Sequence, residues 1–363
     1  MDNLKRFIDC YISTETCNLR CHYCYIAQHN RFNKGLVKFS HSPEEIAKAF
    51  SKERWGGTCL LNFCAGGETL LSPEILPVAK ALLQEGHYVM IVTNGTVNKR
   101  FDEVLEIPEN LRKHLFFKFS FHYLELKRLN WLEKFSSNVN KAKNAGCSFT
   151  IEITPSDELV PFINEVRQYC REVFGADCHV TIARNDTEYN IGHLSKMDFE
   201  TYKKTWGVFN SELFNFKSKI FYKKRKEFCY AGEYTLVCNL SSGELKQCYC
   251  GKVLGNIYDD AKIPFRAIGH GCGYAHCYNG HVFLAMGAIP EIITPSYDYL
   301  RNRRDTNGKE WLTEDVKTFM KQRADMNNSR YNLKQKINSD FHSLDLMAKA
   351  ILKSILKKKD LKE

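Results

Sequence analysis

Short apolar runs alternate with longer segments of helical periodicity through the first half of the chain. The apolar runs are rich in β-branched and aromatic residues, and glycine, proline or capping residues bound them, which is typical of buried strands. Strands that alternate with helices predict a parallel sheet with right-handed crossovers. The predicted strands are residues 6–12, 59–64, 88–92, 115–121, 148–153 and 179–183.

The helices between these strands carry clear start and stop signals. Ser42 can cap a helix, Pro43 fits its first position, and Glu45 can close a capping box, so a helix is expected from there to about Arg54. The next helix is expected to stop at Gly86, because glycine favours the left-handed conformation at a helix end. These signals place helices on the connections of the sheet.

The pattern changes after the sixth strand. A helical bridge over 198–226 is rich in Lys and Phe, and residues 229–277 combine six cysteines with short strand-like runs and glycine turns. Segment 344–361 is basic and amphipathic, which favours packing on the protein itself over a membrane surface. The predicted fold is α/β: a partial (β/α)6 TIM-like barrel, a small cysteine-rich auxiliary-cluster domain and a helical C-terminal tail. The expected domains are 1–200, 201–226, 227–290 and 291–363.

Composition narrows the class of protein. The 363 residues are 44% hydrophobic and 26% charged, as in folded globular proteins, and no apolar run approaches a membrane span. There is no secretory segment, so the fifteen cysteines indicate metal or redox sites in a cytoplasmic protein rather than disulfides. The net charge of +10 is spread along the chain without a basic stripe, and no nucleic-acid partner is expected.

Three cysteines directly follow the first predicted strand. Cys17, Cys21 and Cys24 have the spacing C-x3-C-x2-C. Three thiolates on one loop can hold three irons of a cubane cluster and leave the fourth iron open for chemistry. A structural zinc site is the alternative, since closely spaced cysteines also bind zinc.

Two further loops follow the second and third predicted strands. The first contains Gly66-Gly67-Glu68, and the second contains Thr93-Asn94-Gly95-Thr96. Glycines let backbone approach a ligand closely, and a carboxylate can receive an ammonium group. The carboxyl ends of parallel strands meet at one edge of the sheet, so both loops are expected to face the cysteine loop.

These motifs together resemble the radical S-adenosylmethionine (SAM) enzymes over about residues 1–200. The resemblance implies that the three cysteines bind a [4Fe-4S] cluster whose open iron is chelated by the amino and carboxylate groups of SAM. It also implies that Tyr23 lies beside the adenine and Glu68 receives the ammonium group, while the residues after strands four to six meet the carboxylate or ribose. The implied SAM-binding residues are Tyr23, Gly66, Gly67, Glu68, Asn94, Ser120, Thr154 and Arg184.

The later cysteines resemble the auxiliary-cluster domains called SPASM and Twitch. Cys229, Gly243 and Cys248 follow the order C-x13-G-x4-C, and Cys272 and Cys277 complete four ligands. The full SPASM pattern needs seven cysteines, whereas six are present here at other spacings. One auxiliary [4Fe-4S] cluster, as in the Twitch type, is therefore expected, with zinc as the alternative.

Cys238 and Cys250 remain without a place in that pattern. Each is an alternative ligand, a buried small hydrophobic residue, or a thiol that donates a hydrogen atom to a substrate radical. No role is given to the histidines. The cysteines expected to pack in strands and helices are Cys10, Cys59, Cys64, Cys147, Cys170 and Cys178.

The resemblance implies reductive cleavage of SAM to methionine and a 5′-deoxyadenosyl radical, with a flavodoxin or ferredoxin as the reductant. An electron-carrying second cluster predicts oxidation or cross-linking, whereas a thiol donor predicts epimerisation. Only sixteen residues precede Cys17 and no winged-helix pattern is present, which favours a carbohydrate-like substrate (epimerisation or dehydrogenation) over a ribosomal peptide or protein. A cluster-bearing or zinc-binding redox or interaction protein without catalysis is the other alternative. Peripheral membrane contact through the basic C-terminal helix is a further candidate interaction.

Overall fold

The strands of the protein form one open sheet. The computed structural model describes residues 2–33, 35–188, 190–278 and 280–360. Within these ranges the sheet has the strand order β6-β5-β4-β3-β2-β1-β7-β8-β9, and β1 to β6 pair in parallel with their neighbours. The predicted partial barrel of six parallel strands is confirmed. The strands are β1 Arg6–Ile12, β2 Cys59–Ala65, β3 Tyr88–Thr93, β4 Leu115–Phe121, β5 Ser148–Ile153, β6 His179–Val180, β7 Thr235–Asn239, β8 Glu244–Lys246 and β9 Val253–Asn256.

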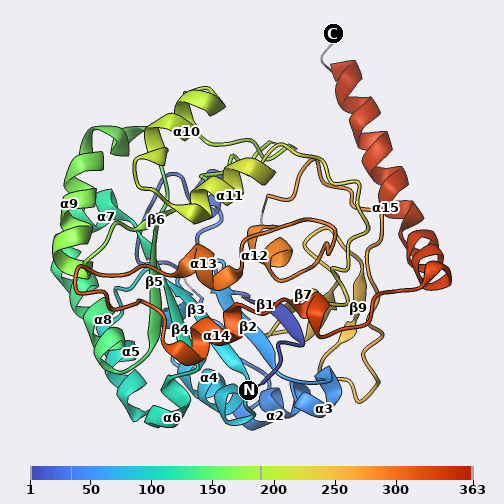
Figure 1. Ribbon diagram of the computed structural model, residues 1–363, viewed down its shortest axis with the longest axis horizontal. Helices are drawn as coiled ribbons and strands as arrows, with labels where there is room; N and C mark the ends of the chain where they lie inside the picture. Colours follow the sequence, from blue (N-terminus) through green and yellow to red (C-terminus); the bar gives the residue numbers. More distant parts are fainter. Residues whose placement is uncertain (1, 34, 189, 279, 361–363) are drawn as a thin grey trace.

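Helices from the first half of the chain cover the outer face of the sheet (Figure 1). The predicted capping box is present: Ser42 Oγ accepts from the Glu45 backbone N–H at 3.2 Å, and Glu45 Oε2 accepts from the Ser42 N–H at 2.8 Å. The helix expected from there to Arg54 is divided in two, because Ser51 adopts φ −51° and ψ 139° between the halves. The outer elements are α2 Pro43–Ala49, α3 Lys52–Trp55, η1 Thr69–Leu71, α4 Ile75–Gln84, α5 Asn98–Glu103, η2 Val104–Glu106, α6 Glu109–Arg112, α7 Tyr123–Arg128, α8 Leu132–Asn144, η3 Asp157–Phe162, α9 Ile163–Phe174 and α10 Phe199–Gly207.

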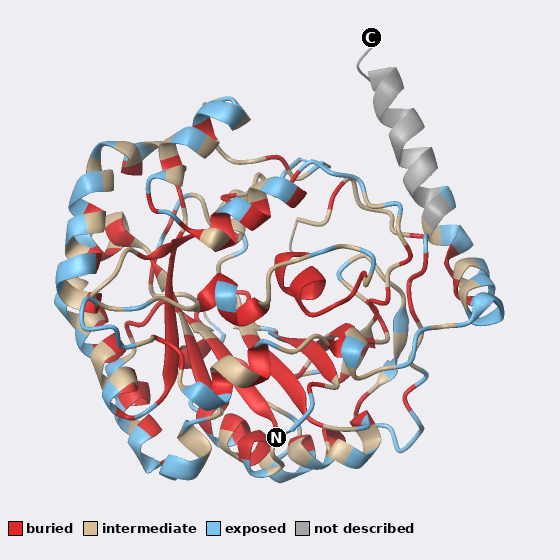
Figure 2. Cartoon of the chain, viewed as in Figure 1, coloured by how far each residue is buried: buried red, intermediate tan, exposed pale blue. Residues whose placement is uncertain are grey.

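The inner face of the sheet is packed by helices that come much later in the chain. The apolar cores on the two faces follow the alternation of the strands: Ile8 and Leu61 belong to the outer core, whereas Phe7 and Leu60 belong to the inner one. Figure 2 shows the strands buried between the two layers. The inner elements are α11 Glu212–Ile220, α12 Gly280–Ala285, α13 Tyr297–Arg301 and α14 Glu314–Met320, and the remaining ones are α1 Tyr25–Gln28, η4 Ala324–Met326 and α15 Leu333–Asp360.

The cysteine-rich region continues the sheet. β7 pairs in parallel with β1, with Cys238 opposite Cys10, and β8 and β9 add antiparallel strands at that edge. The inner core also contacts the cysteines of this region. The four-domain division stays a prediction, but β7 joins its third part to the same sheet as the barrel strands.

The C-terminal helix α15 projects away from the rest of the molecule in Figure 1. The predicted basic amphipathic segment 344–361 lies in this region. The side chains at 347 and 349–360, together with residues 361–363, lie outside the described residues, and so does the predicted membrane contact. None of the described helices combines the length and the apolar character that crossing a membrane requires.

Candidate active site

A cavity of about 280 Å³ opens at the carboxyl ends of the parallel strands. All three cysteines of the loop after β1 line this main cavity. The predicted SAM-binding residues line it as well, although they come from six different strand ends. These residues are Tyr23, Gly66, Gly67, Glu68, Asn94, Ser120, Thr154 and Arg184.

The glycines of the β2 loop lie against the segment that leads to Cys17. Gly67 N–H donates to Thr14 O at 2.6 Å, and Glu68 N–H donates to Thr16 O at 2.9 Å. A Cβ at Gly67 would lie 2.9 Å from Thr16 N and closer still to its carbonyl carbon and oxygen. The sequence predicts a close approach of this loop to a ligand, and the structure shows a close approach of one loop to the other.

Glu68 is buried and joins the β2 and β3 loops. Its carboxylate accepts from Thr93 Oγ1 at 2.6 Å, from Asn94 N–H at 2.7 Å and from Leu70 N–H at 2.9 Å. Burial raises the pKa of Glu68, and these hydrogen bonds oppose the rise. A carboxylate offers about four lone-pair positions, so one acceptor position remains for a ligand such as an ammonium group.

Polar N–H groups approach the sulfur of Cys17. Leu19 N–H lies 3.4 Å from Cys17 Sγ and Asn94 Nδ2 lies 3.8 Å from it, while Asn94 also donates to Asn18 Oδ1 at 2.8 Å. Burial raises the pKa of Cys17 to about 11 and also raises that of Cys21, so both thiols are protonated at neutral pH unless a metal replaces the proton.

The arrangement of the cysteine loop suits an iron–sulfur cluster better than a single metal ion. Among the described residues, no three His, Cys, Asp or Glu side chains gather closely enough to hold one metal ion. A cubane cluster instead takes one thiolate on each of several irons. Three thiols of one loop, facing a cavity and supported by N–H donors at one sulfur, are the donor set that such a cluster uses.

Tyr23 is held by a histidine that the sequence did not single out. The Tyr23 hydroxyl lies 2.9 Å from His122 Nδ1, and both side chains line the main cavity. Burial lowers the pKa of His122 to about 4, so it is neutral at pH 7. His122 directly follows β4, and that position at a strand end was the available signal.

Arg184 lies between the main cavity and the cysteine-rich region. It pairs with Asp186 at 3.4 Å, and its guanidinium lies 4.9 Å from the centroid of the Tyr278 ring. Tyr278 lines a second cavity of about 40 Å³, whose surroundings are mostly apolar. The cation–π contact therefore bridges the walls of the two cavities.

Five cysteines line the second cavity. They comprise the four predicted auxiliary ligands and Cys250, whose sulfur lies 3.9 Å from that of Cys272. Cys250 belongs to the turn that Gly251 N–H closes on Cys248 O at 3.0 Å, so both thiols come to the same place. The cysteines are Cys229, Cys248, Cys250, Cys272 and Cys277.

The structure places Cys238 away from both cavities. Cys238 is fully buried in the outer core and belongs to the lining of neither cavity. Cys238 pairs with Cys10, whose side chain faces the outer core, so Cys238 also faces outward and away from the main cavity. Cys250 faces the second cavity rather than the main one. The cysteine beyond the loop that does line the main cavity is Cys64, which the sequence assigned to packing.

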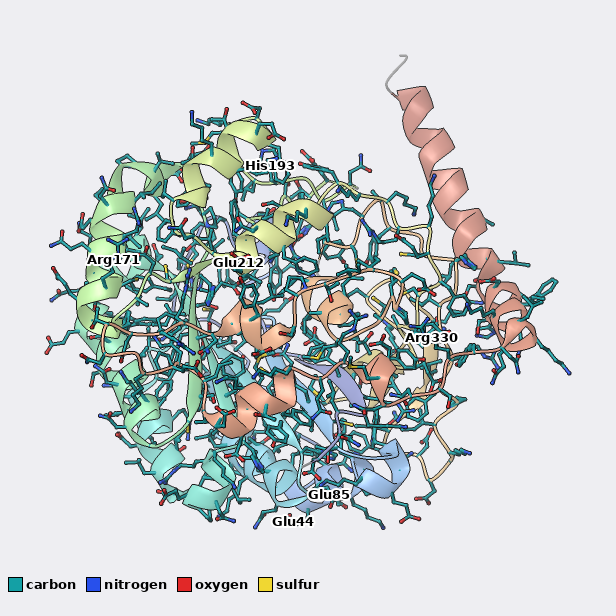
Figure 3. The ribbon with its side chains drawn as sticks, viewed as in Figure 1. Glu44, Glu85, Arg171, His193, Glu212 and Arg330 are labelled. Carbon is teal, nitrogen blue, oxygen red and sulfur yellow. The ribbon has the colours of Figure 1, made fainter. Side chains whose placement is uncertain are left out.

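Charged residues at the inner end of the main cavity, buried or partly buried, were also missed. Lys118 and Glu152 lie two residues before Ser120 and Thr154 on β4 and β5, on the same face of the sheet. Polar residues at every second position of otherwise apolar strands were the signal in the sequence that these side chains share one face of the sheet. Lys217 and His281 reach this place from α11 and α12, and nothing local in the sequence indicates it. Other charged residues, such as Glu44 and Arg171, lie on outer helices at the rim of the molecule (Figure 3).

Helix α12 separates the two cavities. His281 lines the main cavity, whereas Phe283 and Leu284 line the second one. The cysteine loop and the five-cysteine group thus lie on two sides of one buried helix.

Comparison with known proteins agrees with this arrangement. Residues 11–155 match the family described as the Radical SAM superfamily. The chain is 26% identical over 162 residues to 7-carboxy-7-deazaguanine synthase of Aquifex aeolicus (strain VF5), which covers 43% of this chain and 64% of that protein, less than two thirds of its length.

Two solved structures have a similar fold. Streptococcus suis SuiB bound to S-adenosylmethionine has a TM-score of 0.50 at 14% identity, over 73% of this chain and 69% of that one. The same protein bound to precursor peptide SuiA has a TM-score of 0.50 at 13% identity, over 72% and 64%. At these identities the likeness concerns the fold. The segment that matches the Radical SAM superfamily, residues 11–155, contains the cysteine loop and the ends of β1 to β5 that line the main cavity.

Proposed function

We propose that the chain reductively cleaves SAM in the main cavity and removes a hydrogen atom from a carbon of a polar substrate. The observation that carries this proposal is the convergence of three loop cysteines and eight further predicted residues on one cavity. Those residues come from six separate strand ends, so their meeting supports a common ligand.

In this proposal Cys17, Cys21 and Cys24 hold a [4Fe-4S] cluster, and the loops around them place SAM. When bound, the reduced cluster supplies the electron that cleaves SAM to methionine and the 5′-deoxyadenosyl radical. Asn94 and Leu19 N–H support the sulfur of Cys17, and Glu68 fixes the β3 loop while it keeps one acceptor position. The buried walls of the cavity exclude water from a reactive site.

The five-cysteine group is the proposed site of one auxiliary [4Fe-4S] cluster. Cys229, Cys248, Cys272 and Cys277 are the proposed ligands, and Cys250 is an alternative to its neighbour Cys272. Five thiols that line one apolar cavity suit a cluster that replaces their protons.

A carbohydrate-like molecule is the proposed substrate, and epimerisation or dehydrogenation is the proposed outcome. The charged inner end of the cavity supports a polar substrate. A ribosomal peptide or protein is the second candidate, because the similarly folded SuiB is bound to a precursor peptide. A flavodoxin or ferredoxin is the proposed reductant.

The test is anaerobic reconstitution followed by iron and sulfide analysis and a 5′-deoxyadenosine assay after reduction. The proposal expects about eight irons per chain and reductive cleavage of SAM. Stoichiometric zinc without cleavage would instead support a zinc-binding or redox interaction protein and would overturn the proposal.

A further inference from the structure

A cluster of buried and partly buried charged residues lies at the inner end of the main cavity. We call it the basic cluster, and it consists of Lys118 on β4, Glu152 on β5, Lys217 on α11, His281 on α12 and Arg301 on α13. The two strand residues lie two positions before those proposed to meet SAM, which places them about 7 Å deeper along the strands. The basic cluster is thus next to the proposed SAM site and separate from it.

Positive charge exceeds negative charge in the basic cluster. Glu152 is its carboxylate, and it pairs with Arg301 and, at 3.5 Å, with Lys118. Burial alone would raise the pKa of Glu152, but Lys118, Arg301 and Lys217 outweigh burial and hold that pKa well below its usual range. This carboxylate is therefore ionised and already shared by two cations.

Lys217 supplies a third cation with a neutral partner. Its Nζ donates to Thr181 Oγ1, and it forms no ion pair within the part of the chain that the structure describes. Burial, reinforced by Lys118 and Arg301, outweighs the attraction of Glu152 and lowers the pKa of Lys217 to about 7. A buried cation without a paired anion is costly, and an anionic ligand would remove that cost.

His281 contributes an unused hydrogen-bond donor. Its Nε2 lies 2.9 Å from Arg301 NH2, which can only donate, so Nε2 accepts and Nδ1 carries the proton. His281 Nδ1 is buried and has no hydrogen-bond partner among the described residues, in a side chain that lines the main cavity. An oxygen atom of a ligand would satisfy this donor.

We propose that the basic cluster binds an anionic oxygen group of the substrate, a carboxylate or a phosphate, through Lys118, Lys217 and the Nδ1–H of His281. That the anion belongs to the substrate rests on the proposed function, whereas anion binding itself does not. Arg184, the other cation that acts on Lys217, also lines the main cavity, but it is paired with Asp186 and is left to its own partner. The proposal makes the substrate class an acidic or phosphorylated molecule.

The test is calorimetric titration of the anaerobically reconstituted full chain with inorganic phosphate, with acetate and with glucose as a neutral probe. Wild type is expected to bind phosphate or acetate, with proton uptake near pH 8 because a bound anion raises the pKa of Lys217. Lys217→Met and Lys118→Met are expected to weaken that binding about tenfold or more. Lys219→Met is the matched control, because Lys219 is exposed on the same helix, and it is expected to bind as wild type does.

Urea unfolding of each variant verifies that it is folded before it is titrated. Equal anion binding by all four proteins means an adventitious ion only and overturns the proposal. So does the absence of binding to wild type up to about 10 mM, where a millimolar site is largely filled. Glucose binding that depends equally on Lys217 also overturns it.

SAM cleavage is measured on the same samples. Cleavage without Lys217-dependent anion binding refutes this inference alone, and anion binding without cleavage refutes the proposed function alone.

Discussion

Replacing Gly67 by alanine tests whether the β2 loop holds the cysteine loop in place. The new Cβ would lie 2.9 Å from Thr16 N and closer to the carbonyl group of the same residue. Contacts this short involve backbone on both sides, so no side chain can move away to relieve them. The segment that ends at Cys17 must shift instead.

The size of the effect follows from the contacts at this place. A shift threatens two backbone hydrogen bonds, Gly67 N–H to Thr14 O and Glu68 N–H to Thr16 O. Each is worth a net ~0.5–1.5 kcal/mol, and overpacking adds ~1–3 kcal/mol. Gly67→Ala should therefore lower the free energy of unfolding by about 2–6 kcal/mol, measured by urea unfolding of the metal-free chain.

Gly207→Ala is the matched control. A Cβ at Gly207, the last residue of α10, would meet nothing within 4 Å, so its stability should equal or slightly exceed that of wild type. Gly67→Ala should also take up less iron at the cysteine loop on reconstitution. Wild-type stability and wild-type iron content in Gly67→Ala would refute the reasoning, because the loops would then not depend on their close approach.

Three further predictions concern other buried groups. Glu68→Gln should destabilise the chain by about 1–3 kcal/mol in urea unfolding, because an amide has one acceptor oxygen for three donors; an unchanged midpoint would contradict this. The pKa of Lys217 is about 7 in the folded chain and 10.5 in the unfolded chain. Burying the charged amine therefore lowers the free energy of unfolding by its full amount below pH 7, and this cost disappears as pH rises toward 10.5. The stability of wild type relative to Lys217→Met should therefore rise between pH 7 and about pH 9, and a constant difference would count against the assignment. Cys229→Ser should lower iron from about eight to about four per chain, whereas Cys238→Ser should keep the iron and lose stability; equal iron in both would exclude Cys229 as a ligand.

The parallel sheet could be predicted because its strands are buried on both faces. Segments such as 115–121 and 148–153 are short runs between helix signals whose polar residues stand only at alternate positions, and the structure has these bounds. β6 ends at Val180, earlier than the predicted 183, because later backbone groups find other partners. Ala183 N–H, for example, donates to the hydroxyl of Tyr202 at 3.2 Å instead of continuing the ladder.

The residues around the cysteine loop could be placed because they lie at strand ends, and parallel strand ends share one edge of a sheet. The direction of a cysteine could not be inferred in this way. Cys238 points outward and Cys64 inward, and that difference depends on the register of β7 and β2 against β1. The basic cluster could not be predicted from the sequence, because Lys217, His281 and Arg301 meet only after α11 to α13 have packed on the inner face.

The most direct test of the account is 5′-deoxyadenosine formation from SAM by the anaerobically reconstituted and reduced protein. Cys21→Ser is compared with Cys147→Ser, which replaces a buried cysteine outside the lining of either cavity. The account predicts product from wild type and from folded Cys147→Ser, and none from Cys21→Ser. Equal product from Cys21→Ser, or none from iron-loaded wild type, would contradict it.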